Sequence, residues 1–288
     1  MTTTMTPPPL PPQPAAPPPG AGAPTPPRRT SSTVVAIIAI VAGAVLIVGA
    51  IAGSAFAAVR STAVRTETFT AAVNGITGFD VDVSAADLTI IYGDVDQAQL
   101  VVEGTPGDWS FERDGDELSV RTDRSWFGGW SFGRDGGDSA VLTLPSALER
   151  GALDASLSLS AGSITADGTY GELDVDLDAG AIDVSGTAAE LDVDVSAGRT
   201  SLDLAGVRTA EMQVSAGALD GRLRRAPDAL TIDVSAGRVT LELPDETYRV
   251  VSDVEAGGFD NRLDTSAAAS SQISVTVSAG QVVLRPVR

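Results

Sequence analysis

The sequence predicts an all-β protein, a β-solenoid of coils of about 18–20 residues, preceded by one transmembrane helix and a disordered Pro-rich tail. Three observations lead to this prediction. First, a short turn sequence of the type Ser-Ala-Gly recurs eight times. Second, from Gly162 to Gly280 its glycines are spaced 18, 18, 19, 20, 20 and 23 residues apart. Third, segments that alternate apolar and polar residues, as strands do, flank the copies. Two short strands and a tight turn per period are typical of a solenoid, a fold class that binds or scaffolds more often than it catalyses.

Residues 1–33 are predicted to be a disordered cytoplasmic tail. They hold 12 of the 17 prolines and no acidic residue. Such a composition cannot bury enough apolar surface to fold, and runs of proline favour the extended polyproline II conformation. The sharper alternative is that this tail is a docking site for a Pro-binding module.

Residues 34–59 are predicted to be a transmembrane helix. The segment runs from Val34 to Val59 without a charge, and as a helix it would be about 39 Å long, more than the ~30 Å hydrocarbon core of a bilayer. The alternative is a cleaved signal peptide, because Ala55-Phe56-Ala57 has the form of a cleavage site. The apolar stretch is longer than a signal peptide needs, which favours a retained anchor.

The charges around this segment predict a single-pass protein of the cell membrane with its N-terminus in the cytoplasm. Arg28 and Arg29 precede the segment, while Arg60 and Arg65 follow it. This balance is weak, but a large acidic domain is translocated largely regardless of its charge. The C-terminal domain is therefore expected to be extracytoplasmic, with residues 60–66 as a short linker.

Residues 67–147 are predicted to form an N-terminal β cap and the first coil. Phe79–Ile91 resembles one coil, and Arg113-Asp114-Gly115-Asp116 is a turn signal between two strands of a hairpin. The individual strands are expected at Gln99–Glu103, Asp108–Glu112, Glu117–Arg121 and Ala140–Leu144, the last of them stopped by Pro145.

Residues 148–288 are predicted to be the solenoid repeat domain. In Leu191-Asp192-Val193-Asp194-Val195 the apolar side chains face one side and the carboxylates the other, so stacked coils would bury columns of Leu and Val. Pro286, Arg285 and Arg288 are expected to discourage further pairing at the C-terminal edge. Each turn depends on a glycine that accepts positive φ; these structural turn glycines are Gly162, Gly180, Gly198, Gly217, Gly237, Gly257 and Gly280.

With Leu144-Pro145-Ser146 followed by repeated strand–Ser-Ala-Gly–strand units through Leu284, the chain resembles the DUF4097 family of bacterial membrane-associated β-repeat proteins, which carry the label of adhesins. The resemblance covers about half of the chain strongly and residues 66–143 more loosely. It implies a solenoid-like β domain that is exported or anchored to a membrane of the bacterial cell envelope. It defines no catalytic or ligand residue that could be carried over to this sequence.

The composition argues against an enzyme and against a protein that binds nucleic acid. Residues 60–288 contain 17 Arg against 38 Asp and Glu, a net charge of −21, and the chain has no Lys, His or Cys. These absences exclude a Ser-His-Asp triad, a thiol nucleophile, a His-ligated zinc ion and a Walker phosphate loop. We therefore expect no enzyme activity and no cofactor. The cluster Arg222, Arg224 and Arg225 is expected to lie in an exposed loop and to balance nearby Asp residues; the alternative is a contact with an anionic wall polymer.

Acidic residues leave two alternatives open. Paired carboxylates can hydrolyse glycosides, which makes Asp174, Asp176, Asp192 and Asp194 candidates, although the period-2 pattern places them on a solvated face. Carboxylate oxygens also suit hard cations, so the second alternative is weak Ca²⁺ association along this face. No defined metal site is predicted, because the spacing fits neither an EF-hand nor a calcium-binding repeat.

The one candidate ligand site is the Gly-rich aromatic loop, with Trp126, Phe127, Trp130 and Phe132. Aromatic faces stack on sugars or anchor a partner protein; the alternative is a plug over the end of the core or a contact with the membrane. The predicted function is a non-catalytic surface adhesin or cell-wall-binding scaffold, with a cell-wall polymer or an envelope protein as partner. The alternative is a membrane regulator in envelope-stress signalling whose ectodomain senses and whose tail contacts a cytoplasmic protein.

Overall fold

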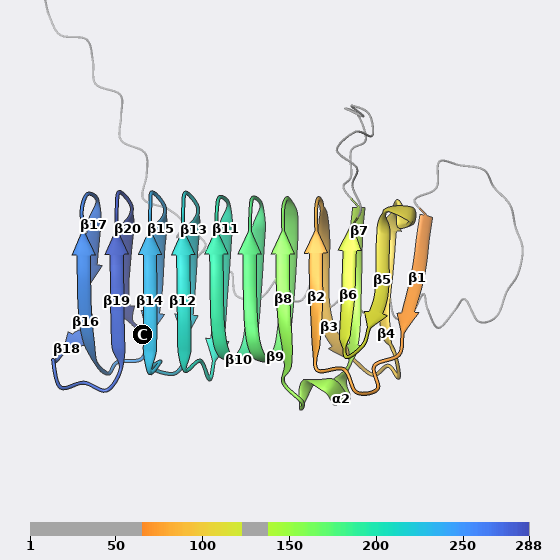
Figure 1. The fold of residues 1–288 in the computed structure, drawn as a ribbon, viewed down its shortest axis with the longest axis horizontal. Helices are drawn as coiled ribbons and strands as arrows, with labels where there is room; N and C mark the ends of the chain where they lie inside the picture. The colour runs from red at the N-terminus through yellow and green to blue at the C-terminus, as the bar shows by residue number, and fades with distance from the viewer. Residues whose placement is uncertain (1–64, 123–137, 288) are drawn as a thin grey trace, which may run out of the picture. The chain divides into compact units, whose positions relative to one another are not determined.

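The computed structural model describes residues 65–122 and 138–287, and this part of the chain is nearly all β. The predicted tail, the predicted membrane segment, the linker up to residue 64 and the aromatic loop lie outside the described residues. Within them, no helix is long and apolar enough to cross a membrane. The strands join in one hydrogen-bonded sheet that runs through sharp bends and so forms two facing layers (Figure 1).

The first layer begins at one end with an antiparallel hairpin and continues through parallel strands to β16. In spatial order it contains β5 (Trp109–Asp114), β6 (Glu117–Thr122), β2 (Gly78–Val83), β8 (Leu153–Leu159), the second halves of β9 (Gly162–Leu177) and β10 (Ala181–Val195), β12 (Thr209–Val214), β14 (Ala229–Val234), β19 (Gln272–Val277) and β16 (Thr247–Val254), with the short β18 (Asp264–Thr265) beside the start of β16.

The second layer, taken from the same end of the stack, ends at β17. In spatial order it contains β1 (Arg65–Ala71), β4 (Ala98–Gly104), β7 (Asp138–Pro145), β3 (Ala86–Gly93), the first halves of β9 and β10, β11 (Arg199–Ala205), β13 (Ala218–Leu223), β15 (Arg238–Leu243), β20 (Gln281–Pro286) and β17 (Gly258–Asn261). One 3-10 turn, η2 (Pro106–Asp108), and one short helix, α2 (Ser146–Glu149), complete the described elements.

Parallel, in-register pairing stacks the apolar side chains as the alternation predicts. Leu173, Val175 and Leu177 of β9 pair with Leu191, Val193 and Val195 of β10, and all six are at most 4% exposed. Burying one such side chain contributes about 1.5–3 kcal/mol relative to leaving it in water. A shift of one residue would exchange these side chains for the Asp row, and this penalty fixes the register.

The order of units in space departs from the order in sequence at both ends of the stack. A unit here means one first-layer strand, the turn, and the second-layer strand that follows. The unit β2–β3 lies between β6–β7 and β8–β9, although it precedes both in the sequence. The unit β19–β20 lies between β14–β15 and β16–β17, although it follows both.

This interchange corrects one expectation. Arg285 and Pro286 were expected at an unpaired C-terminal edge, but β20 pairs with β15 on one side and with β17 on the other. Pro286 stands opposite Leu243 at the end of the strand, where a missing backbone N–H disturbs little of the pairing. Among the described strands, β16 and β17 are the ones without a full neighbour at that end of the stack.

At the opposite end the predicted hairpin is present, with β5 and β6 antiparallel. The antiparallel strands β1 and β4 extend the second layer there. Trp109 is 6% exposed, and Phe69 and Phe111 pack against the core beside it. Aromatic side chains thus contribute to the core at this end.

Candidate functional site

The aromatic loop lies outside the described residues, so the structure places only its two attachment points. Thr122 ends β6 and Asp138 begins β7. The backbone N–H of Ser84 donates to the Thr122 hydroxyl at 2.7 Å, and the N–H of Thr105 donates to the Asp138 carboxylate at 3.1 Å. Both attachment points are therefore held by the strand stack, one in each layer.

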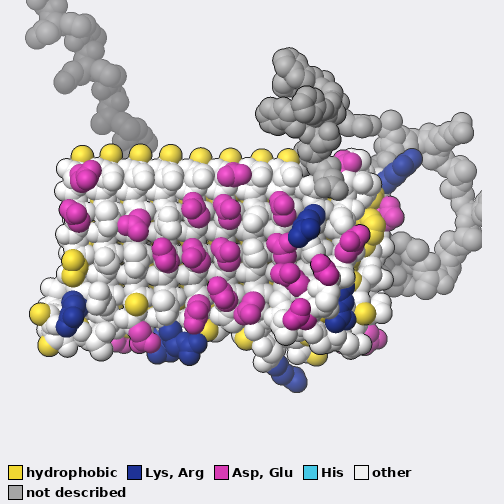
Figure 2. All heavy atoms as spheres, viewed as in Figure 1, with side chains coloured by type: hydrophobic (Ala, Val, Ile, Leu, Met, Phe, Trp, Pro, Cys, Tyr) yellow, Lys and Arg dark blue, Asp and Glu magenta, His cyan; other side chains and the backbone are white. Residues whose placement is uncertain are grey.

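The outer face of the first layer carries the predicted acidic row, and it is wider than one strand (Figure 2). Stacking brings seven exposed carboxylates into one block: Glu172, Asp174 and Asp176 of β9, Glu190, Asp192 and Asp194 of β10, and Glu211 of β12. Adjacent strands lie about 4.8 Å apart, so carboxylates of neighbouring units stand directly opposite each other. The four Asp residues named as glycosidase alternatives all belong to this block.

Two of these carboxyl groups titrate abnormally. Partial burial, together with the charges of Asp178, Asp194 and Asp174, raises the pKa of Asp176. Partial burial, with Asp174 as the first of four acidic neighbours, raises the pKa of Asp192. Burial is the largest cause of each shift, and like charges held side by side by the register add to it. Such a row of like charges destabilises the folded state and attracts cations. Within residues 65–122 and 138–287, however, no group of Asp or Glu is arranged to hold a metal ion.

The outer face of the second layer carries ion pairs instead. Glu242 of β15 accepts from Arg222 of β13 at 2.6 Å and from Arg285 of β20 at 2.8 Å, one strand on either side. Arg224 pairs with Asp203 at 2.7 Å. Arg225 lies 4.0 Å from Asp228, so all three Arg residues of the cluster have an acidic neighbour. The contacts of Arg222 and Arg224 hold the pKa values of Glu242 and Asp203 below their ordinary values.

A third surface is the edge where the turns stack. Its alanines form an exposed row along one edge of the molecule (Figure 2): Ala179, Ala197, Ala216, Ala236, Ala256 and Ala279. Backbone hydrogen bonds continue through the turns, as from Ala216 N–H to Ser196 O at 2.9 Å and from Ala236 N–H to Ser215 O at 2.7 Å. The turn edge is therefore as regular as the strands.

The predicted turn glycines all lie beside this row. Gly162, Gly180, Gly198 and Gly257 adopt positive φ, between +99° and +109°. Gly217, Gly237 and Gly280 do not, and they are glycine for lack of space: a Cβ on Gly280 would lie 2.4 Å from Gly237 O. Close stacking therefore requires glycine at all seven turns, and positive φ is a second reason at Gly162, Gly180, Gly198 and Gly257.

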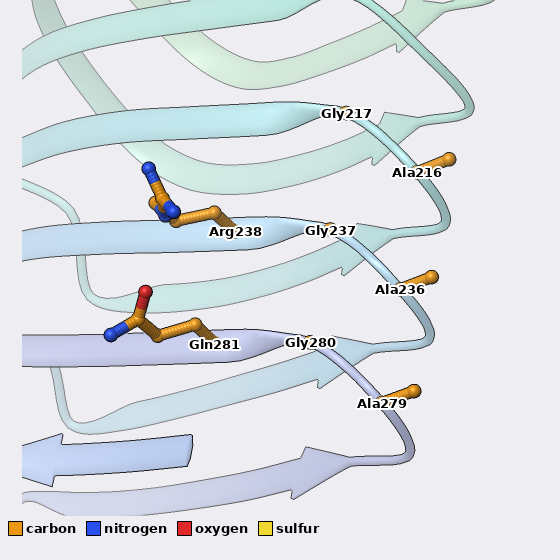
Figure 3. A pocket seen from close by; sticks show the side chains of 8 residues that line it. All are labelled: Ala216, Gly217, Ala236, Gly237, Arg238, Ala279, Gly280 and Gln281. Atoms are coloured by element: carbon orange, nitrogen blue, oxygen red, sulfur yellow. The ribbon is translucent and has the colours of Figure 1, made fainter. Parts of the chain in front are cut away.

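Between the alanine row and the second-layer face lies a hollow of about 350 Å³. Figure 3 shows Arg238 and Gln281 side by side on adjacent strands along one wall, with Ala216, Ala236 and Ala279 on the other side of the glycines. A guanidinium, an amide and methyl groups suit a polar, partly apolar molecule such as a sugar. Sequence reasoning did not single out Arg238 or Gln281, since only the register brings them together.

No family model matches the chain, and a search of curated proteins finds no relative. Among solved structures, a "putative adhesin" from Parabacteroides distasonis is 11% identical, covers 77% of this chain and 97% of its own, and has a TM-score of 0.43. A "putative lipid binding protein" from the same species has 12% identity, the same coverages and a TM-score of 0.43. A "putative cell adhesion protein" from Clostridium sporogenes has 10% identity, coverages of 78% and 100%, and a TM-score of 0.36. These values are too low to transfer a fold or a function, and membership of the DUF4097 family stays a prediction.

Proposed function

We propose that the chain is a non-catalytic β-solenoid, anchored in the membrane by residues 34–59, that acts outside the cytoplasm as an adhesin or a cell-wall-binding scaffold. The observation that carries the proposal is the long polar face of the first layer. From β2 to β12, every first-layer strand carries carboxylates or hydroxyls on this face at the same strand spacing. A surface that repeats along one direction suits an extended polymer, because each repeat of the polymer meets equivalent groups.

Charge narrows the class of polymer. The acidic block repels phosphate-rich and carboxylate-rich chains and favours a neutral glycan or a wall peptide that carries free amines. Two other features offer contacts that sugars accept. One is the hollow beside Arg238, and the other is the set of aromatic side chains in the Gly-rich loop. The hollow lies on another part of the surface than the acidic block, so variants can separate their contributions.

The proposal is tested by sedimenting residues 66–288 with cell wall from the protein's own host. We expect saturable binding that falls at least tenfold in a Trp126→Ala/Trp130→Ala variant if the aromatic loop is the site. A fall of that size in Asp174→Asn/Asp192→Asn instead would assign binding to the acidic face. Absence of binding by the folded domain would refute the wall-binding function and favour the regulatory alternative, in which deletion of residues 1–27 silences signalling.

Anchoring is tested separately. Alkaline carbonate extraction of host membranes should leave the full chain in the pellet and should release a chain that begins at residue 60. Protease added to intact cells with a permeabilised outer surface should digest the β domain and spare residues 1–33. Release by carbonate of a shortened chain that begins near residue 58 would contradict the anchor and support cleavage near Ala55-Phe56-Ala57.

A further inference from the structure

The end of the stack formed by β16 and β17 is only partly covered. The two-residue strand β18 pairs with Thr247 and Tyr248 alone, so the described structure offers no strand partner on this side from Arg249 to Val254. The amide of Arg249 donates to Ser271 O on the β19 side, whereas Tyr248 O accepts from Ser266 N–H on the other side. Because these directions alternate along a strand, Val250, Ser252 and Val254 present their N–H and C=O groups outward from the stack.

The side chains of this edge are unusual for an unprotected strand. Val251 is 56% exposed and Val254 39%, and they are the large exposed hydrophobic residues of the described part of the chain. Natural sheets protect an open edge with proline, bulges or repelling charges. Here the flanking charges are of opposite sign and symmetric: Arg249 and Asp253 stand two residues on either side of Val251 on the outer face of β16.

We propose that a second copy of this chain pairs with β16 in the antiparallel sense, about a two-fold axis at Val251. In this register Arg249 stands opposite Asp253 of the partner subunit, and Val251 stands opposite Val251 of the partner subunit. Val250 and Ser252 of each copy exchange backbone hydrogen bonds with Ser252 and Val250 of the partner subunit. The interface is isologous, as a two-fold dimer requires, and both ion pairs form at once.

The register fits the pairing geometry as well as the charges. Since the hydrogen-bonding groups of Val250 and Ser252 face outward, Arg249, Val251 and Asp253 fall at the non-hydrogen-bonded pairs, where opposing side chains lie closest. Arg249 now donates its Nε and Nη2 to the carbonyl of Ala267 at 3.0 and 2.6 Å. A carboxylate is a stronger acceptor than this neutral carbonyl, so the side chain gains by turning to the partner subunit.

The strand β18 limits the length of the pairing. Beyond Asp253, the strand of the second copy would enter the position that Thr265 holds opposite Tyr248. The paired segment is therefore Arg249–Asp253, five residues from each copy, and the second copy must turn away at Val254, where its own β16 ends. A contact this short makes a reversible association, which matters most where many copies are held on one membrane.

The test uses a cysteine introduced into the full chain, which has none of its own. In Val251→Cys the two thiols face each other across a non-hydrogen-bonded pair with Cα atoms about 4.5 Å apart, a distance that a disulfide accepts. Mild oxidation of the full chain in detergent micelles should give a cross-linked dimer. The matched control is Thr276→Cys on β19, equally on the outer face but one unit further in, which should remain monomeric.

Charge reversal in the Val251→Cys background tests the register. Arg249→Asp and Asp253→Arg should each reduce the cross-linked fraction at least fivefold, and the two together should restore it. The double variant does not restore the contact with Ala267, so restoration distinguishes pairing between copies from a structural role of Arg249 within one copy. No cross-link at Val251→Cys, or a yield unaffected by single reversal, would overturn the proposal, provided circular dichroism shows each variant folded.

Discussion

Asp192 stands directly opposite Asp174 in the parallel register of β10 and β9, and this carboxylate is the first of the charges that raise its pKa. Two like charges held side by side on a well-packed sheet lower the free energy of unfolding at neutral pH. The apolar columns beneath them fix the register, so the strands cannot slip to separate the charges.

Asp192→Asn should therefore stabilise the fold at neutral pH, by about 0.2–1 kcal/mol and less in high salt. A carboxyl whose folded-state pKa is raised destabilises the fold above that pKa and ceases to do so as pH falls through the ordinary value. The gain should thus disappear in acid. Urea unfolding at several pH values measures it, with Asp183→Asn as the control, because Asp183 stands between Thr165 and Ser201. An equal gain in the control would contradict this explanation.

Glu242→Gln should act in the opposite direction. Arg222 holds the pKa of Glu242 below its ordinary value, with Arg285 as a second partner. Such a carboxylate contributes stability above its unfolded-state pKa and loses this contribution as pH falls through the lower folded-state value. Because the guanidinium groups are about half exposed, we expect a loss of about 0.5–1 kcal/mol at neutral pH. The difference between the wild type and the variant should close on acidification, and a difference that persists there would point to packing instead.

Gly180→Ala should be among the most damaging small substitutions. Gly180 has φ +107°, and an added Cβ would lie 2.3 Å from the Gly162 carbonyl oxygen of the next unit. Strained backbone and steric overlap each cost about 1–3 kcal/mol. Gly258→Ala is the matched control, since its nearest atom would be 4.0 Å away and its backbone is not in the left-handed region. Thermal unfolding should show a large drop for Gly180→Ala and almost none for Gly258→Ala.

Leu284→Ala tests the interior position of β20. Leu284 is fully buried between Leu241 and Asn261, so truncation should cost about 2–5 kcal/mol. Val254→Ala, in the half-open end unit, should cost less than about 1 kcal/mol. If β20 were an outer strand, the two variants would lose similar amounts of stability in chemical denaturation.

Local patterns predicted much of this structure. The alternation around Leu191–Val195 and the turn glycines predicted strand positions and buried faces, because side-chain period and backbone conformation are local properties. The interchange of units at both ends left no local signal. The strand β19 carries the same alternation whether it packs against β14 alone or between β14 and β16, and only the balance of tertiary contacts decides between these positions.

Some of the candidate surfaces were likewise predictable from local sequence, and others were not. The acidic face follows from the alternation in β9 and β10, and it was predicted. The pairing of Glu242 with Arg222 and Arg285 depends on residues 20 and 43 positions away, which only the register aligns. The edge of β16 was not predicted, since the sequence gives no reason for β16 rather than β20 to be outermost.

The interchange at the C-terminal side has a consequence for biosynthesis. Residues 247–261 leave the ribosome before residues 272–286, yet in the finished molecule the later segment lies between them and the rest of the stack. While the chain is still emerging, β16 and β17 have no permanent neighbour, and the slot beside β14 and β15 stays open until the later segment arrives. The C-terminal units are therefore completed in one late step, and slow synthesis would prolong the time in which another chain's strand can enter that slot.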